Sequence, residues 1–92
     1  MKRVHLIISG KVQGVYYRQS SKEKADELGL CGWVRNRQNG TVEAVVEGAP
    51  AAVTSFIDWC HSGPSHARVD GVDCTSGEPV SLSGGFTVRP TA

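Results

Sequence analysis

The chain has 92 residues, with 10 lysines and arginines against 9 aspartates and glutamates, and a formal net charge of +1. A charge so close to zero gives no reason to expect a nucleic acid or an anionic membrane as partner. The length fits one domain over residues 1–92, large enough to bury a core without metals or disulfides. No apolar run approaches the roughly 20 residues that span a bilayer, and the start lacks an export signal, so we expect a cytoplasmic protein.

The three cysteines are Cys31, Cys60 and Cys74, which are widely spaced and include no Cys-x-x-Cys pair. This spacing argues against zinc, iron–sulfur and thioredoxin-like sites. The three histidines also show no metal-ligand spacing. We therefore expect no metal and no cofactor, and we expect free thiols, although the sequence leaves a disulfide between two of the cysteines open.

The first elements are a strand and a helix. Residues 3–9 include four apolar residues, three of them β-branched, which is typical of a strand that is covered on at least one face. From residue 17 to residue 28, the less polar residues recur every three or four positions, which predicts one buried face of a helix. Gly29 is well placed to end that helix.

A hairpin comes after the first helix. Residues 30–37 and 41–47 are strand-like runs, and Asn39-Gly40 between them is a strong turn signal. Glu43 and Glu47 alternate with apolar residues in the second run, so we expect both glutamates on a solvated face of the sheet.

The second half of the chain repeats the helix–strand order. Pro50 stands near the start of a second helix, whose buried stripe falls on apolar positions within residues 53–60. Residues 67–74 predict a further strand. Residues 75–85 are rich in serine, glycine and proline and predict a mobile loop, and residues 86–89 predict a short last strand.

The order β-α-β-β-α-β plus a terminal strand predicts an α+β, ferredoxin-like fold, with two helices on one face of an antiparallel sheet. In that arrangement the first and second strands run in the same direction, so their carboxyl ends meet at one edge. Asn36 lies near the end of the second strand. We therefore expect its side chain beside the segment that leads from the first strand into the first helix.

The first strand leads directly into the segment Gly10-Lys11-Val12-Gln13-Gly14-Val15-Tyr16-Tyr17-Arg18. Two glycines on a strand-to-helix turn let successive N–H groups converge on an anion. The helix start adds a positive dipole end, and Arg18 adds a planar fork that suits a phosphate or carboxylate. Spacing alone leaves open a plain turn with a surface arginine. The stretch is neither a Walker A loop nor a dinucleotide fingerprint.

Two long blocks of the chain resemble the acylphosphatase family. They are residues 10–18 and residues 25–36, and shorter matches occur at residues 39–43 and 63–69. The resemblance covers nearly the whole chain. It implies the ferredoxin-like fold and metal-independent hydrolysis of acyl phosphates to a carboxylate and inorganic phosphate.

The resemblance also implies which residues form the site. The family's essential arginine and asparagine fall on Arg18 and Asn36. An acyl phosphate has a good leaving group, so the enzyme needs to hold the phosphoryl group, offset its charge and place a water molecule. Asn36 is too weak a base to abstract a proton, so we assign it the positioning of that water. The phosphate cradle falls on Gln13, Gly14, Val15, Tyr16, Tyr17 and Arg18.

Two other functions fit the same element order. A non-catalytic module could bind an anion in the cradle, but binding alone would not need Asn36. An RNA-binding domain would carry exposed aromatic residues on the third strand, whereas residues 41–47 carry two glutamates. We therefore expect a small acyl phosphate as substrate, inorganic phosphate as a second ligand of the cradle, no nucleic acid or membrane partner, and a monomer.

Overall fold

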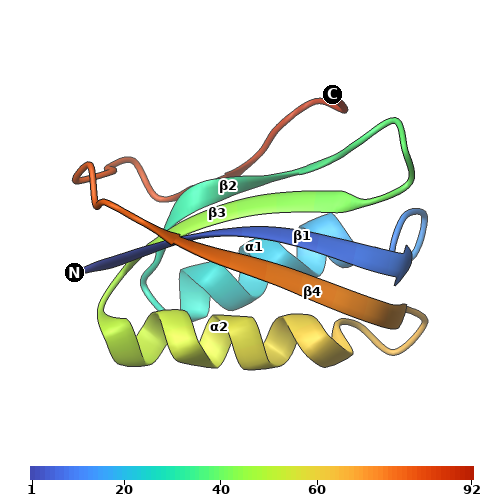
Figure 1. The fold of residues 1–92 in the computed structure, drawn as a ribbon, viewed down its shortest axis with the longest axis horizontal. Helices are drawn as coiled ribbons and strands as arrows, with labels where there is room; N and C mark the ends of the chain where they lie inside the picture. The colour runs from blue at the N-terminus through green and yellow to red at the C-terminus, as the bar shows by residue number, and fades with distance from the viewer.

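The computed structural model describes all residues from Met1 to Ala92. Two helices lie on one face of a five-stranded sheet, and the other face is open (Figure 1). Neither helix is long and apolar enough to cross a membrane. The elements are β1 (Lys2–Lys11), α1 (Tyr17–Glu27), β2 (Cys31–Asn36), β3 (Val42–Gly48), α2 (Pro50–Ser62), β4 (Arg68–Gly77) and β5 (Phe86–Val88).

The strand order in the sheet is β4-β1-β3-β2-β5. The pairs β1–β3, β1–β4 and β2–β3 are antiparallel, which confirms the ferredoxin-like arrangement. β5 is the expected extra strand, but it pairs parallel to β2, so the sheet is mixed. The reason is geometric: β4 runs opposite to β2, and the link over residues 78–85 reverses the chain before β5 joins the far edge.

The core lies between the sheet and the two helices. Alternate residues of β1 face it, as the pattern of a covered strand predicts. The predicted helix faces are also confirmed, except that Leu28 and Ile57 are only partly buried. Phe56 joins α2 to β5 through its contact with Phe86, with ring centroids 5.9 Å apart. The buried helix residues are Tyr17, Ser21 and Ala25 in α1 and Val53, Phe56 and Cys60 in α2.

Tyr17 fixes the start of α1 against the end of α2. Its hydroxyl donates a 2.7 Å hydrogen bond to the carbonyl oxygen of Cys60. That carbonyl lies in the last turn of α2, and the residue four positions later is Pro64, which has no N–H to donate. The Tyr17 ring also packs on Trp59, with centroids 5.4 Å apart. These contacts hold the first residue of α1 in one place.

Gly10 lies inside β1 and not on the turn, so the prediction of two turn glycines is wrong for this one. Its φ is +122°, and a Cβ atom at this position would overlap the carbonyl oxygen of Arg68 on β4. The register between β1 and β4 shifts here, with Asp70 as the extra residue on β4. Gly10 therefore permits the close approach of two strands.

Glu47 is buried, so the prediction of a solvated glutamate is wrong for this residue. It is only 2% exposed, because residues of the 78–85 link fold over it. The N–H groups of Val80 and Leu82 each donate a 3.0 Å hydrogen bond to its carboxylate. The Val80 N–H is the largest cause of a lowered pKa at Glu47, and burial opposes it. The predicted loop is also shorter than expected, since β4 extends to Gly77.

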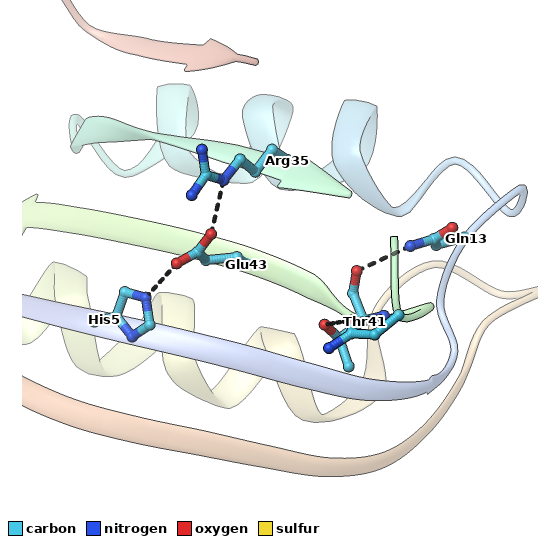
Figure 2. Close-up of polar contacts among 6 residues, drawn as sticks. His5, Gln13, Arg35, Thr41 and Glu43 are labelled. Atoms are coloured by element: carbon cyan, nitrogen blue, oxygen red, sulfur yellow. Dashed lines mark hydrogen bonds and ion pairs between the residues drawn. The ribbon is translucent and has the colours of Figure 1, made fainter. Parts of the chain in front are cut away.

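Glu43 is also less solvated than predicted. Its carboxylate lies between two side chains on the open face of the sheet (Figure 2). His5 donates to it from Nε2 and Arg35 donates from Nε, each at 2.7 Å. Burial raises the pKa of Glu43, but the hydrogen bonds from His5 and Arg35 outweigh it, and the pKa lies below its ordinary value.

Candidate active site

The link between β1 and α1 forms a cradle of free N–H groups. Gly14 has a φ of +74° and Tyr16 a φ of +65°, so the backbone turns twice through the left-handed region. None of the N–H groups from Gln13 to Gln19 donates a hydrogen bond within the chain. Unpaired N–H groups that follow one another through such turns form a concave site for an anion.

The start of α1 adds positive potential to the cradle. Its first turn carries no acidic residue, and no side chain caps its N-terminus. Arg18, in that first turn, is partly buried. It takes part in none of the ion pairs of the structure, so no carboxylate competes for its guanidinium. Arg18 is therefore free to bind an anion with two donors.

Asn36 is the last residue of β2 and is 9% exposed. Its side-chain oxygen Oδ1 is buried and has no hydrogen-bond partner. An unsatisfied buried acceptor costs roughly 1–3 kcal/mol, so this unpaired oxygen lowers the free energy of unfolding. A bound water or ligand with a hydrogen to donate would remove that cost.

Arg18 and Asn36 line one cavity of about 410 Å³. The parallel directions of β1 and β2, each antiparallel to β3, bring the cradle and the end of β2 to the same edge. The expected juxtaposition is confirmed. Among the six expected cradle residues, Gln13 and Val15 do not line the cavity. The lining residues are Val12, Gly14, Tyr16, Tyr17, Arg18, Gln19, Asn36 and Val88.

The model of the acylphosphatase family matches residues 4–88. The chain belongs to the acylphosphatase family. It hydrolyses acyl phosphates to a carboxylate and inorganic phosphate, as the resemblance of its two sequence blocks implies. A curated acylphosphatase from Rubrobacter xylanophilus is 53% identical over 89 residues, which cover 96% of this chain and 80% of the relative.

Two solved acylphosphatases share the fold along more than nine-tenths of their length. One from Bacillus subtilis has a TM-score of 0.93 and 31% identity, covering 97% of this chain and 99% of that chain. Another from Coxiella burnetii has a TM-score of 0.90 and 39% identity, covering 96% of this chain and 92% of that chain. These acylphosphatases and the present chain therefore have closely similar backbones.

The side chain of Gln13 ties the acylphosphatase cradle to the β2–β3 hairpin. Its Nε2 atom donates to the carbonyl oxygen of Arg37, at 2.7 Å. It also donates to the carbonyl oxygen of Thr41, at 2.9 Å (Figure 2). The Arg37 N–H in turn donates to Thr41, at 2.8 Å, which closes the hairpin. Because Arg37 follows Asn36 directly, the Gln13 side chain supports the position of Asn36 instead of lining the cavity.

The segment after β5 supports the other edge of β2. The backbone N–H of Arg89 donates a 2.8 Å hydrogen bond to the carbonyl oxygen of Val34. The backbone N–H of Ala92 donates a 3.0 Å hydrogen bond to the carbonyl oxygen of Asn36. The backbone N–H of Gln38 donates a 2.8 Å hydrogen bond to the carbonyl oxygen of Ala92. The backbone of Asn36 is therefore paired on both sides, with β3 on one edge and this segment on the other.

The predicted site residues did not include Val12, Gln19 or Val88. Val12 belongs to the recognised block at residues 10–18. Gln19 comes one residue after the recognised block and reaches the cavity because α1 begins at Tyr17. Val88 is far away in the sequence and arrives only because β5 pairs with β2, opposite Val34. No local pattern in a three-residue strand could reveal that pairing.

Proposed function

We propose that the backbone N–H groups of residues 13–18 bind the phosphoryl group, that Arg18 offsets its charge, and that Asn36 positions the attacking water. The observation that carries this assignment is the buried, unpartnered Oδ1 atom of Asn36, a residue that lines the same cavity as Arg18. The free N–H groups of the cradle support it. The N–H groups can donate hydrogen bonds to an anionic group, and the unpaired Oδ1 acceptor of Asn36 can accept one from a water molecule.

The chemistry requires little from acids and bases. The leaving group of an acyl phosphate is a carboxylate, which departs without first taking a proton. In the transition state, charge spreads over the equatorial phosphoryl oxygens, which the cradle and Arg18 contact. Asn36 accepts one hydrogen of the water through Oδ1 and directs the oxygen lone pair toward phosphorus. The positive potential of the cradle supports a reaction that runs without a metal ion.

The test is the hydrolysis of benzoyl phosphate, followed by ultraviolet absorbance at neutral pH, with and without a chelator. We expect R18A to lose about 10³-fold in kcat/KM, with weaker inhibition by inorganic phosphate. We expect N36A to lose about 10²-fold in kcat, with the phosphate inhibition constant nearly unchanged. The matched control is R68A, at an exposed arginine outside the cavity.

The outcomes separate the alternatives. Near wild-type kcat in N36A would rule out its role in placing the water. Activity that disappears with the chelator would rule out the metal-independent reaction. If the wild type binds inorganic phosphate without hydrolysing the substrate, the protein is an anion-binding module.

The proposal also covers the domain organisation, oligomeric state and location of the enzyme. We propose one domain over residues 1–92 that works as a monomer in the cytoplasm. The three cysteines are free, and Cys74 is exposed, which suits a reducing compartment. The formal net charge of +1 gives no reason to expect a nucleic acid on the open face of the sheet. Light scattering, cell fractionation and a titration with single-stranded RNA test these points.

A further inference from the structure

Two of the four exposed large hydrophobic residues meet at the cavity. Tyr16 is 78% exposed and Val88 is 39% exposed, and both line it. The other two, Met1 and Val80, lie elsewhere in the fold. Tyr16 belongs to the link before α1 and Val88 to β5, so two separate segments bring apolar surface to the same opening.

The Tyr16 ring has no packing partner that explains its position. The aromatic pairs of the structure involve other rings, and both arginine–aromatic contacts are made on Trp33. Its backbone is also in the left-handed region, at a φ of +65°, which residues other than glycine rarely adopt. The fold therefore holds a large ring in water, beside the anion cradle, at a conformational cost.

The cavity has two chemically different parts. Gly14, Arg18 and Asn36 bring the polar groups to which the proposed function assigns the phosphoryl group and the water. Val12, Tyr16, Tyr17 and Val88 bring hydrocarbon and aromatic surface. An acyl phosphate has the same two parts, an anionic phosphoryl group and a carbon-based acyl group. With the phosphoryl group in the cradle, the acyl group must leave it through the opening that Tyr16 and Val88 border.

We propose that Tyr16 and Val88 bind the acyl group of the substrate, so that this protein prefers acyl phosphates with apolar, and above all aromatic, acyl groups over acetyl phosphate. The inference rests on the proposed function, because it assumes that the phosphoryl group occupies the cradle. The gain comes from covering the Tyr16 ring and the Val88 methyl groups with the acyl group, which removes apolar surface from water. A methyl group covers much less of this surface than a phenyl ring.

The test compares two substrates and two stable analogues. Turnover of benzoyl and acetyl phosphate gives the ratio of kcat/KM for the pair, and calorimetry with benzoylphosphonate and acetylphosphonate gives the same ratio for binding alone. We expect the benzoyl-to-acetyl ratio to fall about tenfold in Y16A and about threefold in V88A. Y16F keeps the ring and should keep the ratio. V80A, at an exposed valine away from the cavity, should also keep it.

Each result has one meaning. A ratio that falls in Y16A and V88A but not in Y16F and V80A supports the inference. Equal losses for both ligands would show that Tyr16 acts only through the shape of the cradle and would overturn it, as would an unchanged ratio. If the wild type binds the phosphonates but hydrolyses neither substrate, the proposed reaction fails, while the phosphonate ratio still decides the role of Tyr16.

Discussion

The Nε2 atom of Gln13 lies 2.7 Å from the carbonyl oxygen of Arg37 and donates a hydrogen bond to it. This bond and the one to Thr41 link the phosphate cradle to the strand that ends in Asn36. The two halves of the proposed site are therefore joined by a side chain outside the cavity. The water that we propose Asn36 to position would depend on this link for its direction toward the phosphoryl group.

We predict that Q13A lowers kcat about tenfold, because loosening the hairpin misplaces the water by a fraction of an ångström. Binding of inorganic phosphate should change little, since the N–H groups of the cradle remain. Steady-state kinetics with phosphate as inhibitor measure both quantities. Q38A is the matched control, because the Gln38 side chain makes no hydrogen bond and should leave kcat unchanged. Wild-type kcat in Q13A would contradict the positioning role.

The hydrogen bond between Tyr17 and Cys60 should show in stability. Y17F leaves the Cys60 carbonyl without its donor, and we expect the free energy of unfolding to fall by about 1–2 kcal/mol. Urea denaturation measures it. Y16F is the control, because the Tyr16 side chain is exposed and donates no hydrogen bond, so its midpoint should match the wild type. Equal midpoints for Y17F and Y16F would refute the argument.

The Y16F variant also isolates the titration of Tyr17, since the chain has two tyrosines. Burial, the largest cause, raises the pKa of Tyr17 far above its ordinary value of 10.0. We therefore expect no phenolate absorbance in Y16F until alkali unfolds the protein. Ultraviolet difference spectra and circular dichroism, recorded along one pH series, compare the two events. Phenolate formed before unfolding would show that solvent reaches Tyr17.

Two glycines with positive φ should respond differently to alanine. At Gly10 a Cβ atom would overlap the backbone of β4, whereas at Gly84, with a φ of +87°, it would meet nothing within 4 Å. We predict a loss of roughly 3 kcal/mol or more for G10A, because a backbone clash adds to the conformational cost. G84A bears the conformational cost alone, about 1 kcal/mol. Similar urea midpoints for the two variants would contradict the close approach of β1 and β4.

Acid should weaken the fold through Glu43 and Glu47. Both folded pKa values lie below the ordinary value of 4.5, so the folded protein binds fewer protons than the unfolded chain in that range. Their stabilising effect is therefore present above pH 4.5 and is lost as the pH falls through the folded pKa values. We expect an almost constant urea midpoint from pH 7 to about pH 5, and a decline below pH 4.5.

E47Q tests the acid prediction directly. We expect a lower urea midpoint at pH 7, because the amide binds the Val80 and Leu82 N–H groups less well, and a shallower decline in acid. E78Q, at an exposed glutamate of the same link, is the control. The acid prediction fails if E47Q declines as steeply as the wild type.

The sequence was enough for the elements and for the expectation that Arg18 and Asn36 lie at the same edge of the sheet. Helix faces follow from local periodicity, and the expected place of Asn36 follows from the parallel directions of β1 and β2. Both depend on patterns within one or two elements, which a single sequence displays.

Contacts that depend on distant pairing could not be predicted from the sequence. Glu47 has the pattern of a solvated strand residue, and only the path of residues 78–85 buries it. Gly10 has the sequence position of a turn glycine, and only the closeness of the Arg68 carbonyl oxygen on β4 shows why a glycine is needed there. Val88 belongs to the cavity because β5 joins the far edge of the sheet. In each case the deciding neighbour lies more than 30 residues away in the chain.

The pairing of the sheet also governs when the enzyme becomes active during synthesis. Arg3 pairs with Gly77, and Asn36 is bonded to Ala92, so the ladders join residues far apart in the chain. Such long-range ladders close large loops before their contacts stabilise them, which slows folding. A nascent chain carries Arg18 and Asn36 early, but β1 lacks one neighbour until β4 leaves the ribosome. We therefore expect catalytic competence to arrive late, after β4 has emerged and the edge of β2 has paired.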